Sequence, residues 1–561
     1  MRFFSLLLAL STCFVFSQNP YPQDYFRNPL DIPIVLAGTF GELRSNHFHS
    51  GLDIKTQQRV GLKVYTAAEG YVSRIKVSTF GYGKALYITH PNGYTTVYAH
   101  LKDYSDKIES YVKNAQYDKQ SFHIELFPTP DELPISANEL VAFSGNTGGS
   151  AGPHLHFEIR DKKEHPMNPM LFGMDVPDTR RPTILKVFVY PADEHSYVNH
   201  ANKRRELRLI PQENGDYKAE PIQAYGKIGF GVVTHDKLDG AYNKNGVSNI
   251  KSFFNGSKIL EIDFKRFSFD ETKHLNRLID YEYFKNNKSR IQKLFIEPNN
   301  PLSLYKDPDN NGYIQVEDST SSVYRVRIKD FKNNEAWLTI PIEGKKDANY
   351  QPKSSEKTEY YVYHDQSSTL SGENVEVDFP SHTFYDDFYI DFRVSNDTLY
   401  LHQSTIPAQK NFFINWDISH YTGEDKDKLY IASVSKYGKI YYSSTQKKGN
   451  VLTCGTKNLG TYTLATDTIN PTIKPMNFQN GKWVSKQRYL KLKIDDEHSG
   501  VKSYRGTING KWILMEYDYK KNTLIYDFTD NIISESENNL KVIVTDNVGN
   551  SSTFEAIFFR K

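Results

Sequence analysis

The most informative run of this chain is Gly152-Pro153-His154-Leu155-His156-Phe157-Glu158-Ile159-Arg160. Its polar and apolar residues alternate, and such alternation is typical of a β-strand whose two faces meet different surroundings. We expect the apolar face to pack on a core and the polar face, with His154 and His156, to point outward. Same-face neighbours lie roughly 6.6 Å apart along a strand, so one imidazole can bind a metal while the other stays free beside a substrate.

The chain before this strand predicts an all-β domain that ends near Gly173. Alternating runs lie at 64–72, 81–88, 94–101 and 122–127. Asn92-Gly93, between two of these runs, is a strong signal for a β-hairpin. One short helix is expected at 102–120, and the Gly-rich turn 145–149 leads into the histidine strand.

Length and composition bound the class of protein. A chain of 561 residues is too long for a single core, which predicts about three or four domains. Its 39 Tyr and 34 Phe favour half-buried strands over helical bundles. The 69 basic and 67 acidic residues leave a net charge of +2, so no charge excess points to nucleic acid. The two cysteines, Cys13 and Cys454, predict no internal disulfide once an N-terminal signal is removed.

Residues 1–17 read as a secretory signal, with Arg2 as the charged start and cleavage expected before Gln18. The apolar run is shorter than the about 20 residues of a membrane-spanning helix, and no later segment qualifies, so no transmembrane anchor is expected. Leu10-Ser11-Thr12-Cys13 resembles a lipoprotein processing box, with a poorly fitting Thr before the cysteine. We expect an exported protein of the periplasm or cell envelope, with release outside the cell as the alternative.

Two later segments of the chain repeat one pattern. The repeated features are Arg181-Pro182-Thr183-Ile184 with Asn470-Pro471-Thr472-Ile473, and Asp330 and Asn334 with Asp546 and Asn550. Each Asp–Asn turn follows an alternating strand. Turns of this kind, repeated at domain scale, are typical of immunoglobulin-like sandwiches.

The spacing of His49 and Asp53 makes them a candidate pair of metal ligands. Zinc enzymes use three protein ligands and keep a fourth position for water or substrate. In a straight strand the pair would be about 13 Å apart, too far to converge on one ion, but Gly51 between them permits a bend. Alone, this pair reads as solvated and His100 as a structural histidine. The chain has no His-Glu-x-x-His, which excludes the helical zinc-protease arrangement.

Together, these motifs resemble the lysostaphin-type zinc metalloendopeptidases that cleave peptidoglycan cross-links. The matching motifs are His49-x-x-x-Asp53, Tyr98-Ala99-His100-Leu101, Ser144-Gly145-Asn146-Thr147-Gly148, the run 152–160 and Asn168-Pro169. The resemblance covers about 38–173. It implies that His49, Asp53 and His156 hold one catalytic zinc, and that His100 and His154 flank the metal-bound water and the substrate carbonyl. All five residues are present, so the resemblance implies an active enzyme.

The roles of the remaining polar residues stay open at this point. Either His154 or His100 can accept the proton of the attacking water, while the other stabilises the oxyanion or protonates the leaving amine. Glu158 either orients a ligand histidine or, as the more ordinary interpretation, is a solvated strand residue. Arg44 either lines the groove or lies on the plain surface. His47 shares a notional face with His49 but lacks its spacing to Asp53, so we do not expect it to be a ligand.

One stretch, 103–136, is longer than the short link usual in that family and is expected to wall one side of the groove. The expected organisation is a signal peptide at 1–17, a zinc metalloendopeptidase domain at 18–175, an immunoglobulin-like β domain with an insert at 176–345, a divergent β module at 346–465 and an immunoglobulin-like β domain at 466–561. The fold class is therefore all-β, with an open groove in the N-terminal domain.

The predicted function is hydrolysis of stem peptides or peptide cross-links of bacterial peptidoglycan by a secreted zinc enzyme. The C-terminal modules are then spacers, or docking surfaces for an envelope protein partner. One alternative is a non-catalytic scaffold that binds wall peptides or regulates another hydrolase. Another is a zinc endopeptidase whose target is a protein, such as a glycine-rich chain.

Overall fold

The computed structural model describes residues 19–352 and 357–561. The expected signal peptide, 1–17, lies outside the described residues. The described chain is mostly β, as expected, and its α-helices are α1 (Asp106–Lys119), α2 (Leu275–Leu278) and α3 (Tyr281–Asn287). Among these helices, none has the length and apolar character needed to cross a membrane.

The N-terminal domain is built on a nine-stranded sheet with the main order β1-β2-β11-β6-β5-β4-β8, and on a small sheet of β3, β10 and β7. Its strands are β1 (Leu36–Gly38), β2 (Leu52–Lys55), β3 (Lys63–Tyr65), β4 (Gly70–Val77), β5 (Lys84–Thr89), β6 (Thr95–Leu101), β7 (Asp103–Tyr104), β8 (Ile124–Leu126), β9 (Pro134–Ile135), β10 (Leu140–Phe143), β11 (His154–Arg160) and β12 (Pro166–Met167). The predicted histidine strand is β11, between β2 and β6. The predicted hairpin joins β5 to β6, and Gly93 takes the positive φ of 86° that this turn requires.

The second module holds a thirteen-stranded sheet with the main order β15-β13-β18-β25-β24-β19-β20-β22. Its strands are β13 (Thr183–Pro191), β14 (Tyr197–Val198), β15 (Arg205–Leu207), β16 (Leu209–Pro211), β17 (Tyr217–Ala219), β18 (Ile222–His235), β19 (Asn249–Phe254), β20 (Ser257–Asp263), β21 (Gln292–Lys293), β22 (Tyr305–Lys306), β23 (Ile314–Val316), β24 (Ser321–Lys329) and β25 (Glu335–Gly344). Helices α2 and α3 lie within 269–300, in the module for which the sequence predicted an insert.

The third module pairs two five-stranded sheets, β27-β28-β32-β36-β35 and β30-β31-β37-β33-β34, around its own apolar core. Its strands are β26 (Tyr360–Val362), β27 (Ser368–Gly372), β28 (Val375–Phe379), β29 (Phe388–Ile390), β30 (Phe392–Ser395), β31 (Thr398–Leu401), β32 (Phe412–Asp417), β33 (Leu429–Val434), β34 (Ile440–Tyr442), β35 (Thr445–Lys448), β36 (Val451–Thr456) and β37 (Gly460–Thr466).

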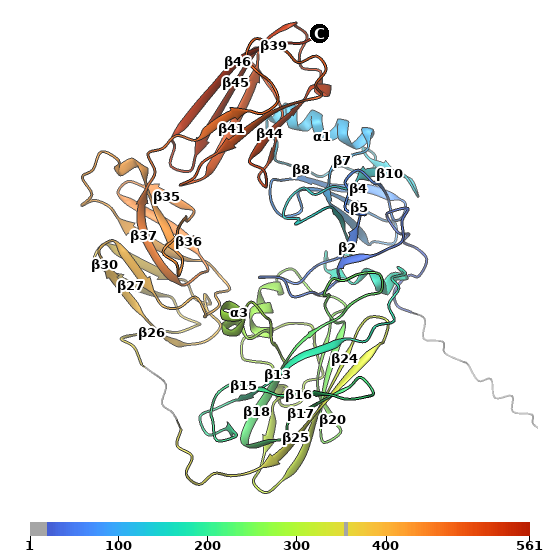
Figure 1. Ribbon diagram of the computed structural model, residues 1–561, viewed down its shortest axis with the longest axis vertical. Helices are drawn as coiled ribbons and strands as arrows, with labels where there is room; N and C mark the ends of the chain where they lie inside the picture. The colour runs from blue at the N-terminus through green and yellow to red at the C-terminus, as the bar shows by residue number, and fades with distance from the viewer. Residues whose placement is uncertain (1–18, 353–356) are drawn as a thin grey trace, which may run out of the picture.

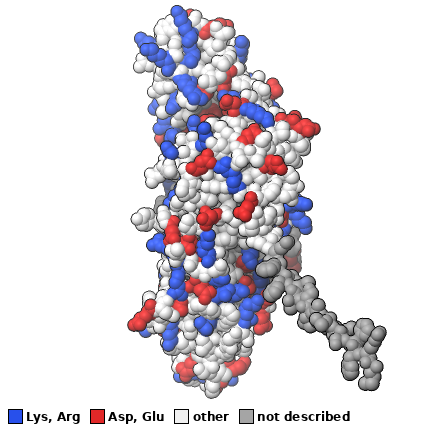
Figure 2. Space-filling model, turned by 90° about the vertical axis from the view of Figure 1, so that its right-hand side faces the viewer, with Lys and Arg blue, Asp and Glu red and all other residues white. Residues whose placement is uncertain are grey.

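The C-terminal module has a four-stranded sheet, β38-β40-β44-β43, and a five-stranded sheet, β39-β46-β45-β41-β42, that share one core. Its strands are β38 (Thr472–Pro475), β39 (Lys482–Trp483), β40 (Tyr489–Asp495), β41 (Val501–Ile508), β42 (Lys511–Trp512), β43 (Met515–Asp518), β44 (Thr523–Asp527), β45 (Glu537–Asp546) and β46 (Ser551–Phe559). Figure 2 shows acidic and basic side chains interspersed over the face that it displays, in keeping with the net charge of +2.

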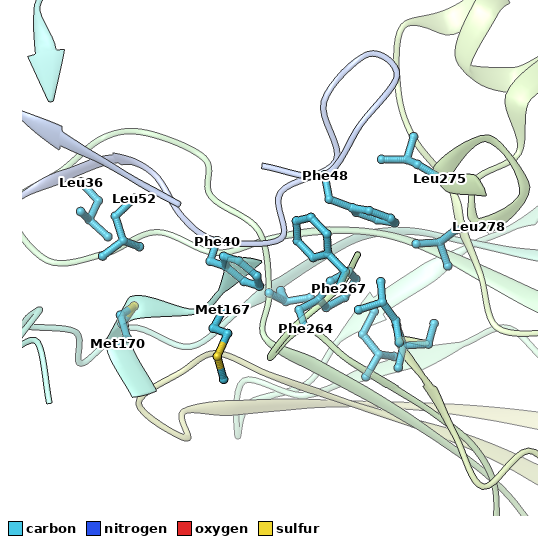
Figure 3. Packing of buried hydrophobic residues seen from close by; sticks show 14 of the residues in the cluster. Leu36, Phe40, Phe48, Leu52, Met167, Met170, Phe264, Phe267, Leu275 and Leu278 are labelled. Carbon is cyan, nitrogen blue, oxygen red and sulfur yellow. The ribbon is translucent and has the colours of Figure 1, made fainter. Parts of the chain in front are cut away.

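The N-terminal domain and the second module share a single hydrophobic core (Figure 3). Phe40 stacks on Phe267 with ring centroids 5.0 Å apart, and Phe48 packs on the same ring at 5.3 Å. The backbone N–H of Phe48 also donates to the Thr272 hydroxyl at 2.8 Å. Phe48 directly precedes His49, so the second module supports the segment that carries a candidate metal ligand.

Trimming this shared core is expected to destabilise both parts together. In Phe267→Leu, we expect the free energy of unfolding to fall by about 1–2 kcal/mol, because Phe267 is fully buried and its ring contacts would be lost. Denaturant unfolding followed by fluorescence measures the change. Phe127→Ala is the control, since that ring is 68% exposed and should matter little. Unfolding in two separate transitions, of which Phe267→Leu moves only that of the second module to lower denaturant concentration, would contradict a shared core.

The chain folds back so that the C-terminal module meets helix α1 of the first domain (Figure 1). Tyr117 packs edge-on against Trp512 with ring centroids 5.3 Å apart, and its hydroxyl donates to Asp530 at 2.7 Å. The ammonium of Lys84 pairs with Glu516 at 2.8 Å. A cavity of about 550 Å³ lies between the two parts. The long stretch 103–136 thus provides, through α1, a docking surface for the C-terminal module.

Candidate metal centre

Strand pairing places Asp53 beside His156. In the antiparallel pairing of β2 and β11, these two residues are direct partners, and direct partners present their side chains on the same face of a sheet. On its other side, β11 pairs with β6, with Ala99 opposite His156. The histidine strand therefore lies in the middle of the candidate site.

His49 reaches the same point because the chain bends just before β2, as Gly51 predicted. A Cβ atom at Gly51 would lie 2.2 Å from the carbonyl oxygen of Phe157, so only glycine allows this close approach. A hydrogen bond on the side away from Asp53 orients the His49 ring, since its Nδ1 lies 2.7 Å from the Thr39 carbonyl oxygen and donates to it. Its Nε2 is then left with a lone pair that faces Asp53.

Three donor atoms converge at the centre of the site. His49 Nε2 lies 2.9 Å from Asp53 Oδ1 and 3.1 Å from His156 Nδ1, and the same Asp53 oxygen lies 2.9 Å from His156 Nδ1. The ligand atoms of a tetrahedral zinc ion, with bonds of ~2 Å, are about 3.3 Å apart. The spacing of this trio is therefore close to that of three zinc ligands.

The tautomers of the two rings also fit a cation. His156 Nε2 lies 2.8 Å from Glu158 Oε1 and donates to it, so Nδ1 carries the lone pair, as does Nε2 of His49. Two lone pairs and a carboxylate oxygen facing one another repel unless a proton or a metal ion lies among them. The residues therefore fit a zinc ion of the kind the resemblance implied.

The electrostatics of the trio reflect this crowding. Burial lowers the pKa of His156, but hydrogen bonds with Asp53 and Glu158 outweigh burial and raise it to about 9. Burial raises the pKa of Asp53, but His49, His154 and His156 hold it well below its ordinary value. The trio thus keeps Asp53 ionised, which is the state that binds a metal.

Glu158 is buried, and its interpretation as a solvated strand residue is wrong. Its carboxylate is 0% exposed and accepts hydrogen bonds from Ser50, at 2.6 Å, and from Tyr82. Its second oxygen accepts from Arg160 Nε at 2.7 Å. The polar face of β11 does not point outward as expected, because these side chains cover it. The sequence did contain a signal for this contact. Glu158 lies two residues after His156 on a strand, so the two side chains share a face.

Arg44 is part of the site, and the alternative of a plain surface residue is wrong. Its guanidinium pairs with Asp53 Oδ2 at 3.0 Å and with Glu42 at 3.0 Å. A Cβ atom at Gly38 would lie 2.5 Å from the Arg44 Nη2 atom, so a glycine there leaves room for the pair. Arg44 thus fixes the Asp53 oxygen that does not face the histidines. His47 is exposed and is not one of the three residues whose donor atoms converge.

His100 and His154 lie side by side next to the trio, with ring centroids 4.8 Å apart. His100 has a positive φ of 59°, an uncommon conformation that interrupts the strand alternation where β5 and β6 shift register. His100 Nδ1 donates to the Thr147 carbonyl at 2.8 Å, and His154 Nδ1 to the Gly152 carbonyl at 2.9 Å. Each ring therefore keeps Nε2 free to accept a proton, and burial together with His156 and His154 lowers the pKa of His100 to about 3.

Comparison with known proteins identifies the kind of domain that carries these residues. The family model described as Peptidase family M23 matches residues 47–117, and the model described as a Zu5-like domain matches residues 359–467. An M23 peptidase domain of the lysostaphin type therefore lies near the N-terminus, as the motifs predicted. The C-terminal part consists of several β-sheet modules, which include the Zu5-like one.

Several known proteins are similar to about a quarter of this chain. The DD-carboxypeptidase/endopeptidase Mpg of Neisseria meningitidis is 31% identical over 136 residues, which are 24% of this chain and 25% of that protein. The peptidoglycan DD-endopeptidase ShyB of Vibrio cholerae is 27% identical over 28% of this chain and 30% of its own length. In several curated relatives, the part that is similar to this chain makes up about a quarter of their own length. The solved catalytic domain of lysostaphin from Staphylococcus simulans is 20% identical, covering 27% of this chain and 91% of that one, with a TM-score of 0.17.

Proposed function

We propose that the M23 domain is an active zinc metalloendopeptidase that cleaves stem peptides or peptide cross-links of bacterial peptidoglycan. The observation that carries this proposal is the convergence of His49 Nε2, Asp53 Oδ1 and His156 Nδ1 within 3.1 Å of one another. We assign these three residues as zinc ligands and His100 and His154 as catalytic residues. The substrate class is supported by the names of the similar proteins, which describe peptidoglycan DD-endopeptidases.

The residues of the site are proposed to have different roles in hydrolysis. When bound, zinc supplies a Lewis acid that polarises a carbonyl group and lowers the pKa of water. His154 and His100 offer Nε2 atoms from rings that their Nδ1 hydrogen bonds hold in place. Either ring can accept the proton of water at Nε2, and a ring that has taken up a proton there can donate it to the leaving amine. The low pKa of His100 keeps its ring neutral at pH 7, but it also makes the ring a weak base, because an efficient base has a pKa near the working pH.

The rest of the chain is proposed to present this domain to its substrate in the envelope. We assign an exported protein, with the peptidase domain at 18–175 and β modules at 176–345, 346–465 and 466–561. The first and last of these modules are proposed to be immunoglobulin-like, because they repeat the Pro-Thr-Ile and Asp–Asn features. Their role is to space the peptidase or to bind an envelope protein partner.

Digestion of purified sacculi by the zinc-loaded protein tests this proposal. We expect mass spectrometry to show new muropeptides cut at a peptide bond, and expect a chelator to abolish them. Unchanged muropeptides alongside cleavage of a glycine-rich protein would instead favour a protein substrate. Zinc binding without cleavage of either material would favour a scaffold that binds wall peptides or regulates another hydrolase.

A contact from the C-terminal module is expected to position His100. Lys520 Nζ donates to the Asn146 carbonyl at 2.6 Å, next to Thr147, whose own carbonyl holds His100. Exposed polar contacts of this kind contribute about 0.2–1 kcal/mol. We therefore expect Lys520→Ala to lower kcat by up to about fivefold with zinc content unchanged.

The matched control for Lys520→Ala is Lys521→Ala, because that neighbouring side chain is 78% exposed and pairs with Asp518 at the surface. Steady-state kinetics on a soluble muropeptide, with zinc measured in the same samples, compares the two variants. Equal kcat values would mean that the loop around Thr147 orients His100 without the C-terminal module.

A further inference from the structure

A second group of acidic side chains lies far from the candidate zinc site in sequence. Asp178, Asp236 and Asp330 place carboxylate oxygens within 4.8 Å of one another. Their exposed fractions are 9%, 2% and 2%. Asp178 belongs to the connection that leaves the peptidase domain, whereas Asp236 and Asp330 follow strands β18 and β24 of the second module. The cluster therefore joins the connecting segment to the body of that module.

The cluster lacks a neutralising partner. Within residues 19–352 and 357–561, no Lys, Arg or His forms an ion pair with any of the three carboxylates. Asp178 Oδ2 and Asp236 Oδ1 are buried without a hydrogen-bond partner. Burying unpaired carboxylates costs several kcal/mol each. Accordingly, burial and the neighbouring Asp178 and Asp330 raise the pKa of Asp236 to about 8.

A buried amide lies beside the cluster. Asn245 is the direct antiparallel partner of Asp236, with backbone hydrogen bonds of 2.9 and 2.8 Å in both directions. Direct partners share a face, so its amide lies next to the Asp236 carboxylate. Asn245 is 3% exposed, and neither its Oδ1 nor its Nδ2 atom has a hydrogen-bond partner. An amide oxygen left unpaired beside three carboxylates completes a set of oxygen donors for a cation.

The same arrangement recurs at the start of the C-terminal module. Asp467, Asp496 and Asp546 also bring carboxylate oxygens within 4.8 Å of one another. There the Asn550 amide donates to the Asp467 carbonyl at 2.8 Å and to Asp546 Oδ2 at 2.6 Å. The buried Ser499 hydroxyl has no hydrogen-bond partner.

The two clusters use one hydrogen-bond pattern. In the second module, the Asn334 amide donates to the Asp178 carbonyl at 3.2 Å and to Asp330 Oδ2 at 2.8 Å, as Asn550 does in the C-terminal module. The first aspartate of each trio also accepts from the backbone two residues later, from Arg180 and from Ile469. Each trio therefore fastens the segment that enters a β module to the ends of strands within it.

We propose that Asp178, Asp236 and Asp330, with the amide oxygen of Asn245, bind a calcium ion that fixes the connection between the peptidase domain and the second module, and that Asp467, Asp496 and Asp546 bind a second one. Carboxylate and amide oxygens are hard donors that suit Ca²⁺, Mg²⁺ or Mn²⁺ and not zinc. Ca²⁺ tolerates irregular sets of six to eight oxygens, whereas Mg²⁺ demands a regular octahedron and keeps several waters. Donors drawn from three separate segments favour the more tolerant ion.

Calcium titration of the full chain tests this proposal. The protein is stripped with EDTA and reloaded with one equivalent of zinc, and Ca²⁺ is added up to about 10 mM, beyond the weakest usual calcium sites. We expect calorimetry to detect two calcium ions per chain and the Tm to rise with Ca²⁺ more than with Mg²⁺. No binding and no rise in Tm would overturn the proposal, and an equal rise with Mg²⁺ would overturn the choice of calcium.

Two isosteric variants separate the sites. Asp236→Asn is expected to lose one calcium ion, and Asp496→Asn the other. Asp236→Asn should also raise the Tm of the calcium-free protein, because an amide avoids the cost of burying that carboxylate or of protonating it, so lost binding is distinguishable from misfolding. Asp309→Asn is the control, since Asp309 is an exposed turn residue outside both clusters. Full calcium binding by Asp236→Asn would overturn the first site, and by Asp496→Asn the second.

Discussion

The variant His156→Ala is expected to lose both bound zinc and peptidase activity, whereas His154→Ala is expected to keep zinc and lose activity alone. His156 Nδ1 lies 2.9 Å from Asp53 Oδ1 and 3.1 Å from His49 Nε2, so its removal leaves two of three proposed ligands. His154 stands beside the trio, with Nε2 3.3 Å from the same Asp53 oxygen. Its proposed work is proton transfer, which contributes about 10²–10⁴-fold to rate.

Zinc content after dialysis and kcat on a muropeptide, measured on the same samples, distinguish these two roles. His47→Ala is the matched control, because His47 is an exposed histidine two residues from a proposed ligand, and we expect it to keep zinc and activity. Melting temperatures of all three variants show whether the fold survives. Equal loss of zinc in His154→Ala and His156→Ala would overturn the division into ligand and catalytic residue.

Local sequence patterns were enough to find the strand and its histidines. The alternation of residues 154–160 identified β11, and Asn92-Gly93 identified the β5–β6 hairpin, because both signals depend on neighbouring residues. The same alternation did not predict that the Glu158 side chain is buried. Whether a polar face meets water or other side chains depends on residues such as Tyr82 and Ser50, which reach it from other segments.

Long-range packing accounts for the rest of what the sequence did not reveal. The stacking of Phe40 on Phe267 and the docking of Trp512 on Tyr117 join segments hundreds of residues apart, and no periodicity encodes such pairs. The predicted boundary near residue 175 therefore falls between two sheets that share a core. The repeated Asp330–Asn334 and Asp546–Asn550 turns were visible in the sequence. The other two aspartates of each cluster come from distant segments and join these turns only in the folded chain.

Glu158→Gln is expected to weaken zinc binding and to destabilise the whole domain. The carboxylate holds His156 Nε2 at 2.8 Å, and removal of such an outer partner typically lowers metal affinity about 10–100-fold. It also neutralises Arg160, which is 5% exposed and would be left with a neutral amide in place of a carboxylate. Removing one partner of a buried ion pair costs about 3–5 kcal/mol. Competition with a zinc chelator and denaturant unfolding measure the two effects.

A neighbouring carboxylate provides the control for Glu158→Gln. Glu164 pairs with the same Arg160 at 3.2 Å but is 55% exposed, so Glu164→Gln should change stability by about 0–1 kcal/mol and leave zinc affinity unchanged. Burial raises the pKa of Glu158, but Arg160 and His156 outweigh burial and hold it below its ordinary value. Its stabilisation is therefore present above an unfolded pKa of about 4.3 and is lost as the pH falls through the lower folded value. If the two glutamine variants have the same stability and the same zinc affinity, the negative charge of Glu158 does not orient His156. The buried side chain of Glu158 would then contribute to β11 only by packing.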